Sequence, residues 1–203
     1  MRPLETDPVF DDRPVYKALR FIGWSLIIFL AYKLASCGHV DVHWKEEVML
    51  ASGQKIVVKR TAKGETLGEI GGPGGWRSTV MTLEIVDPKS AAHPPVWSEP
   101  WVPMVFDVDP DTGHWFVIAT FYMCEDWYAL GRPKLPYLQF VQTEGRWERV
   151  PLEEKFFGRE SNLLTGPRSG GEPRLVTLKE KSGRNLVAAE KFRSVLAVWV
   201  TGC

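Results

Sequence analysis

The chain lacks an excess of charge of either sign, because 25 basic residues balance 25 acidic residues. Proteins that bind the phosphate backbone of nucleic acids need a strongly positive surface, so this balance argues against nucleic-acid binding. Familiar catalytic patterns are missing as well, since neither Gly-x-Ser-x-Gly nor His-Glu-x-x-His occurs. We therefore predict no catalytic residue and no cofactor, and we place binding ahead of catalysis.

Long hydrophobic runs are scarce, and the most apolar one, residues 21–32, is only twelve residues long. As a helix it would rise about 18 Å, which is less than the hydrocarbon core of about 30 Å. The apolar region of a secretory signal peptide, by contrast, usually has about 7–15 residues. The length therefore favours a signal peptide over a membrane span.

The residues Leu34-Ala35-Ser36-Cys37 follow that run and resemble the lipobox of bacterial lipoproteins. The resemblance implies that the chain is cut before Cys37 and that lipid is attached to this cysteine, which would anchor the protein through its acyl chains. Residues 1–37 would then be the signal peptide, and residues 38–203 would form a single exported domain.

Other features of this region favour an uncleaved membrane anchor instead. Lys33 is a charge close to the cysteine, and several acidic residues precede the apolar run, which is unusual for a signal peptide. If the Lys33 side chain snorkels, residues 21–40 could form one span of about twenty residues. A buried core helix is the third alternative. Both anchored forms place residues 38–203 in the bacterial cell envelope, facing the periplasm.

The remaining sequence alternates short apolar segments with turns that contain glycine or proline, a pattern typical of antiparallel strands. Nine tryptophans and fifteen prolines also suit strands and turns better than a helical bundle. We predict one mainly β domain, an antiparallel sandwich or a partly open barrel, built from successive hairpins. The predicted hairpins join residues 46–50 to 55–60, residues 104–108 to 114–122, and residues 137–142 to 146–152.

Three other segments complete the predicted domain. Residues 78–86 are expected to form a further strand. The glycine-rich residues 64–76 and the proline-rich residues 87–100 are expected to be loops. The tail, residues 174–200, fits either strands or one short helix followed by a closing strand.

The three cysteines are few enough for each to have an expected role. If Cys37 is acylated, Cys124 and Cys203 remain as an even pair in an oxidising compartment, where disulfides form. A bridge between them would close a loop of about 80 residues and stabilise the fold by roughly 4 kcal/mol. The alternative is a pair of buried free thiols, and an uncleaved anchor would leave Cys37 as a third thiol.

His39-x-Asp41-x-His43 is the one predicted metal site. In an extended segment, alternate side chains point to the same side, so these three could converge on one ion. The competing interpretation is a solvated tether that follows the anchor.

Asp107-x-Asp109-x-Asp111-x-Gly113 resembles the start of a calcium-binding loop, in which alternate carboxylates bind one ion. The pattern then fails, because Thr112 replaces the required glycine and the bidentate acid at the end of the loop is missing. We therefore predict a plain hairpin turn here.

Aromatic residues are frequent in the central region, and many of them lie beside prolines. Packing in the core is their usual role, but it would be hard to bury all of them at once. A surface patch that binds a partner or stacks on a saccharide is therefore predicted from Trp97, Trp101, Trp127 and Tyr128.

Two stretches resemble an uncharacterised family of proteobacterial envelope proteins. The first runs from Trp44-Lys45-Glu46-Glu47-Val48 to Arg60, and the second runs from Cys124 through Gly131-Arg132-Pro133 to Glu154. The resemblance implies an origin in the bacterial envelope. No activity is established for that family, so it implies no functional residue.

Two functions follow from these expectations. The first is a membrane-anchored envelope protein whose β domain binds another envelope component, either a protein or a saccharide. The second is a metal-dependent or hydrolytic enzyme that acts on envelope material, with His39, Asp41 and His43 as its nucleus. A pocket that gathers a histidine with carboxylates would favour the enzyme, whereas an exposed aromatic patch would favour binding.

Overall fold

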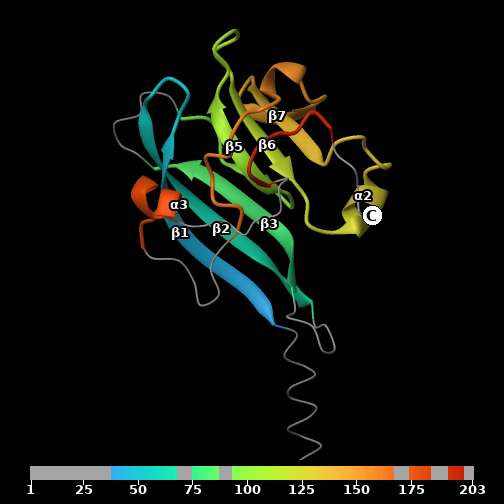
Figure 1. Ribbon diagram of the computed structural model, residues 1–203. Coiled ribbons are helices and arrows are strands. Elements are labelled where there is room, and N and C mark those ends of the chain that lie inside the picture. The colour runs from blue at the N-terminus through green and yellow to red at the C-terminus, as the bar shows by residue number, and fades with distance from the viewer. Residues whose placement is uncertain (1–37, 68–74, 87–92, 167–173, 184–191, 199–203) are drawn as a thin grey trace, which may run out of the picture. The chain divides into compact units, whose positions relative to one another are not determined.

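The computed structural model describes residues 38–67, 75–86, 93–166, 174–183 and 192–198, which form mainly β structure (Figure 1). This part of the chain holds two antiparallel sheets of four strands, each arranged in sequence order. The first sheet contains β1 (His39–Met49), β2 (Lys55–Leu67), β3 (Gly75–Ile85) and β4 (Trp97–Glu99). The second contains β5 (Val102–Val108), β6 (Trp115–Thr120), β7 (Tyr137–Thr143) and β8 (Arg146–Val150). The predicted mainly β, antiparallel fold class is confirmed.

The hairpin of β1 and β2 begins the first sheet, and its turn lies where the sequence predicts it. The Leu50 N–H donates to the carbonyl of Gln54 at 2.9 Å, and Gly53 has a φ of 82°, which costs glycine little. Alternate side chains are buried along β1 from Trp44 onward, as expected when one face of a sheet covers a core.

Gly64 shows why the predicted loop over residues 64–76 is wrong at both ends. β2 continues through this glycine, and β3 already includes Trp76. The Trp76 ring lies against Gly64, so a Cβ there would come within 2.6 Å of the ring and 2.1 Å of the Arg77 carbonyl oxygen. The glycine therefore allows a close approach of two strands at a bulge instead of opening a loop.

The second sheet contains the other two predicted hairpins, and both are confirmed. Between β5 and β6, the Asp109 N–H donates to the His114 carbonyl at 2.9 Å, and Gly113 has a φ of 74°. Between β7 and β8, Glu144 and Gly145 both have positive φ, which matches the right-handed twist of paired strands.

Several short elements were not predicted from the sequence. β4 lies within the expected loop over residues 87–100 and pairs with residues 81–83, in the second half of β3. The six-residue helix α2 (Cys124–Ala129) and the 3-10 helix η1 (Glu154–Phe156) are also new. In the tail, α3 (Leu178–Gly183) agrees with the short-helix alternative. Each element is too short to show a periodic pattern of apolar residues.

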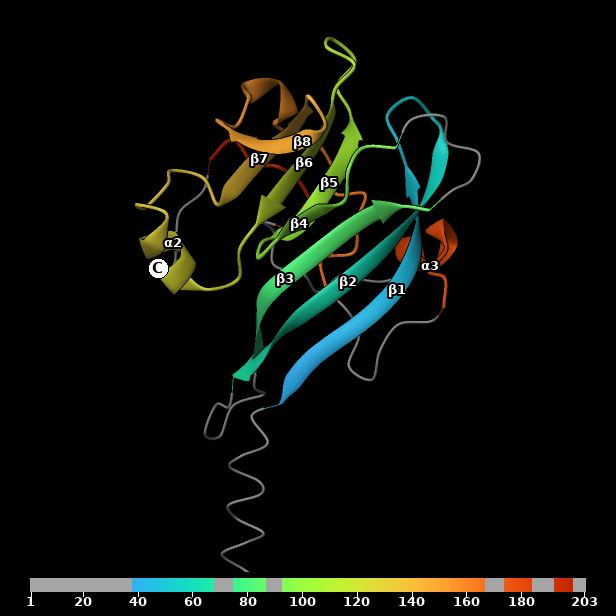
Figure 2. The ribbon, with the colours of Figure 1, turned by 180° about the vertical axis from the view of Figure 1, so that it is seen from behind.

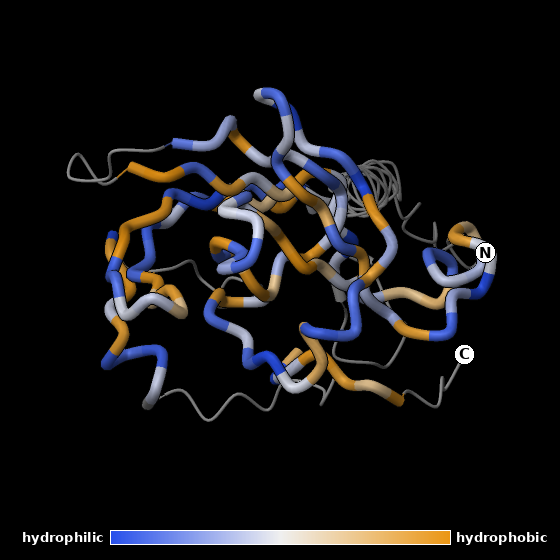
Figure 3. Tube along the Cα trace, turned by 90° about the horizontal axis from the view of Figure 1, so that it is seen from above, coloured by the Kyte–Doolittle hydropathy of each residue, from blue (hydrophilic) through white to orange (hydrophobic). Residues whose placement is uncertain are grey.

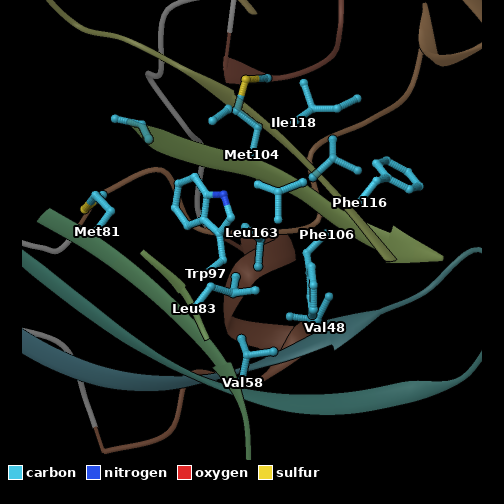
Figure 4. Close-up of a cluster of buried hydrophobic side chains, with 14 of the residues drawn as sticks. Val48, Val58, Met81, Leu83, Trp97, Met104, Phe106, Phe116, Ile118 and Leu163 are labelled. Atoms are coloured by element: carbon cyan, nitrogen blue, oxygen red, sulfur yellow. The ribbon is translucent and has the colours of Figure 1, made fainter. Parts of the chain in front are cut away.

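The core lies between the two sheets (Figure 4). Side chains from β1 to β4, among them Val48, Val58, Leu83 and Trp97, face side chains from β5 and β6, with Leu163 between them. Polar and apolar residues are interleaved along the described chain and not separated into blocks (Figure 3). One core therefore holds both sheets together.

The segment after η1 joins the edges of the two sheets. The Asn162 side-chain amide donates to the carbonyls of Met49 at 3.0 Å and Phe106 at 2.9 Å, and its oxygen accepts from the Phe106 N–H at 3.0 Å. Further along the chain, Val176 forms a β-bridge with Glu46 of β1, which is the edge strand of the first sheet. Figures 1 and 2 show that α3, which follows Val176, and α2 lie at opposite ends of this pair of sheets.

The predicted signal peptide or anchor, including Cys37, lies outside the described residues and stays a prediction. The described residues from His39 onward group into one compact unit. In the part of the chain that the structure describes, no helix has the length and apolar character needed to cross a bilayer.

Candidate functional site: a hollow beside α2

A hollow of about 550 Å³ lies beside α2. Segments that are far apart in the sequence form it: the helix and the turn after it, η1 with the residue that follows, and the chain near residue 198. Its lining consists of Trp127, Arg132, Pro133, Lys134, Leu135, Glu154, Phe157, Ala197 and Val198. Volumes between about 300 and 1,000 Å³ are typical of sites for small ligands.

The end of α2 positions Arg132. Gly131 and Arg132 both have positive φ, 78° and 60°, and the Arg132 N–H donates to the Trp127 carbonyl at 2.9 Å. This turn places the guanidinium over two rings, 5.8 Å from the Trp127 centroid and 5.3 Å from the Tyr128 centroid. Left-handed backbone costs a non-glycine residue about 1–2 kcal/mol, and such strain concentrates at functional sites.

Trp127 is held in one orientation. Its indole N–H donates to the Pro133 carbonyl at 3.0 Å, and Tyr128 packs edge-on against it with a centroid distance of 5.0 Å. The polar atom of the indole is thus satisfied within the chain, and the apolar body of the ring forms part of the wall. The hollow therefore has a rigid aromatic side.

Three charged side chains line the hollow: Arg132, Lys134 and Glu154. All three residues are exposed. None of them makes an ion pair or a side-chain hydrogen bond with any residue that the structure describes. Their donors and acceptors are therefore available to a ligand, and cations outnumber anions.

The structure brings together half of the predicted aromatic patch. Trp127 and Tyr128 touch each other, and half of the Tyr128 surface, 50%, is exposed. Trp97 is fully buried because it faces the core from β4. The prediction that it belongs to a surface patch is therefore wrong. Trp101 is half-buried, packs edge-on against Phe121 and does not line the hollow.

The predicted metal ligands lie on β1, away from the hollow lining. His43 Nε2 is 3.0 Å from Asp41 Oδ1, while His43 Nδ1 is 3.0 Å from the Thr61 hydroxyl. His39 does not join them, and no group of three metal-ligating side chains occurs within the described residues. Both ring nitrogens of His43 already have partners, and the Lys63 ammonium lies 3.7 Å from the Asp41 carboxylate. Side chains that share one face of β1 are therefore engaged with each other and with β2, and they do not converge on a metal ion.

The acidic hairpin is a network of ion pairs, in agreement with the predicted plain turn. Lys155 donates to Asp109 at 2.8 Å and to Asp111 at 3.2 Å, and Arg159 pairs with Asp107. Burial raises the pKa of Asp109, but hydrogen bonds from Lys155, the Asp111 N–H and Thr112 outweigh this and lower it overall. Cations of the chain thus stand where calcium would have to bind.

A buried ion cluster connects the first sheet to α3. Glu46 and Arg60 are both fully buried and form an ion pair of 2.8 Å. The other oxygen of Glu46 accepts from Lys181 at 2.7 Å and from the Leu164 N–H at 2.9 Å. The cluster therefore fixes α3 and the segment after η1 to the sheet.

Arg60 is not fully satisfied in this cluster. Its Nη1 also donates to the Leu164 carbonyl at 3.2 Å, but Nε and Nη2 have no partner among the described residues. Burial lowers the pKa of the Arg60 guanidinium, and the charge of Glu46 opposes this. Glu46 is thus the carboxylate on which the buried cation depends.

Cys124 begins α2, beside the hollow. Cys203 and Cys37 lie outside the described residues, so the bridge between Cys124 and Cys203 and the lipidation of Cys37 stay predictions.

The charged residues of the hollow were missed in the sequence. Gly131 and Pro133 around Arg132 are a local signal for a helix end, which could have drawn attention to this turn. Glu154 carries no such signal, because only the fold brings it to the hollow.

Comparison with known proteins finds no matching family model, no matching curated protein and no matching solved structure. The resemblance to proteobacterial envelope proteins therefore stays a prediction.

Proposed function

We propose that this chain is a membrane-anchored protein of the bacterial cell envelope whose antiparallel β-sandwich domain faces the periplasm and binds another envelope component. The observation that carries the binding function is the hollow beside α2. It combines an apolar wall with three charged side chains that have no partner among the described residues. Such a combination is typical of ligand sites, in which a few polar groups orient a ligand against an apolar surface.

The chemistry of the lining supports binding over catalysis. The side chains of Arg132 and Lys134 can donate hydrogen bonds to a ligand, that of Glu154 can accept them, and the remaining lining residues are apolar. Hydrolysis through a covalent intermediate would need a nucleophile paired with a general base, and these residues do not supply such a pair. Asp41 and His43, the nucleus of the enzyme alternative, are already engaged with residues of their own sheet.

Photo-crosslinking in intact membranes tests the binding function. Val198 lines the hollow and is 77% exposed, whereas Val96 is 49% exposed and lies outside the lining. With a benzophenone amino acid at position 198 of the full chain, we expect an adduct that is absent when the same group stands at position 96. Equal labelling from both positions, or no adduct from position 198, would contradict the proposal.

The mode of anchoring has its own test. We expect the intact mass of the protein extracted from membranes to show the loss of the first 36 residues and the addition of a diacylglyceryl group at Cys37. A full-length mass without lipid would reject the lipoprotein in favour of the uncleaved anchor.

A further inference from the structure

We infer that the ligand of the hollow is an acidic saccharide, a chain of sugar rings that carries carboxylate or phosphate groups. The inference rests on the proposed binding function and names the chemical class of its ligand.

The size of the hollow favours a short chain molecule over a folded protein. A stable protein interface buries about 800 Å² on each partner and is centred on a cluster of packed side chains. The hollow is lined by exposed charged side chains and not by such a cluster. Its volume of about 550 Å³ lies within the range of sites for small ligands.

The cations select an anion. Arg132 is held over the Trp127 and Tyr128 rings, and neither Arg132 nor Lys134 has a counter-charge among the described residues. A guanidinium that cation-π contacts hold near two rings offers a fork of donors, which matches the paired oxygens of a carboxylate or phosphate.

Glu154 favours a ligand that also donates hydrogen bonds. Its carboxylate accepts only, and it finds no donor among the described side chains. The carboxylate of a fatty acid would bring only further acceptors to Glu154, and a single inorganic anion is too small to reach both Arg132 and the apolar wall with several donors. The hydroxyl groups of a sugar donate to such a carboxylate while the acidic group of the same molecule pairs with Arg132.

The apolar wall fits the rest of a sugar ring. Trp127, Leu135 and Phe157 present carbon surface, with Val198 at the exposed end. One face of a pyranose ring carries mostly C–H groups, so it can bury area against such a wall while the hydroxyls on its rim reach the charged side chains.

Calorimetric titration of the full chain in detergent, at fixed ionic strength, tests the inference. The probes are trigalacturonic acid, its uncharged methyl ester, a triglutamate peptide and inorganic phosphate. We expect the acid to bind about tenfold more tightly than the ester. Arg132→Gln should remove most of that preference, and Glu154→Ala should weaken binding of the ester.

Arg146→Gln is the matched control, because it removes the same charge from an exposed arginine of β8 that does not line the hollow. Its affinity for the acid should equal that of the unchanged protein. The inference is overturned if the ester binds as tightly as the acid, if R132Q and R146Q behave alike, or if the trisaccharide does not bind. Equal affinity for triglutamate or for phosphate overturns it too, in favour of a peptide or a free anion. The binding function survives each of these results if the adduct at position 198 still forms.

Discussion

Replacing Glu46 with alanine is expected to lower the free energy of unfolding by about 3–5 kcal/mol, because it leaves a buried arginine without its counter-charge. Arg60 is fully buried, and Nε and Nη2 already lack partners among the described residues. Lys181 and the Leu164 N–H would lose the same carboxylate. One substitution therefore breaks the charge pair and the attachment of two chain segments.

Urea unfolding measured by tryptophan fluorescence is the appropriate experiment. Glu148→Ala in β8 is the matched control, because Glu148 also pairs with an arginine on a strand but is 43% exposed. Surface ion pairs contribute about 0–1 kcal/mol, so this variant should lie close to the unchanged protein.

A double replacement separates the charge from the packing. Combining Glu46→Leu with Arg60→Met removes both buried charges, and such apolar replacements are often close to neutral. We expect the double variant to be more stable than E46A, with a residual loss because the Leu164 N–H no longer has its acceptor. If E46A and E148A lost equal stability, the buried pair would have no special role.

The hairpins could be predicted because their signals are local. Asp109 and Gly113 determine a turn within five residues, and Gly53 does the same between β1 and β2. Gly64 gave the wrong prediction, because a glycine that opens a loop and one that lets Trp76 approach look alike in sequence. Only the pairing of β2 with β3 distinguishes them.

The hollow could be predicted only in part. Trp127 and Tyr128 were singled out as aromatic residues, but Trp97 was singled out on the same grounds and is fully buried. The difference depends on which face of β4 covers the core, and a strand of three residues does not reveal it. Glu154 reaches the hollow through contacts between distant segments, which composition and spacing do not encode.

The predicted disulfide would join α2 to the end of the chain. Val198 and Trp127 line the same hollow, and Trp127 lies three residues after Cys124 in α2. Cys203 follows Val198 by five residues, which reach at most about 18 Å when fully extended. Cys203 lies outside the described residues, so the bridge between Cys124 and Cys203 stays a prediction.

Replacing Cys124 with serine is accordingly expected to lower the free energy of unfolding by about 4 kcal/mol, because the open loop of about 80 residues restores entropy to the unfolded chain. Cys203→Ser should have the same effect, the two losses should not add, and a reductant should destabilise the unchanged protein equally. Cys37→Ser is the control and should leave the stability unchanged.

Peptide mapping without reduction provides the direct measurement, and a protein in which both Cys124 and Cys203 react with an alkylating reagent has no such bridge. The bridge would fix the chain end that follows Val198. Its loss should therefore also lower the affinity for any ligand that binds between Val198 and Trp127.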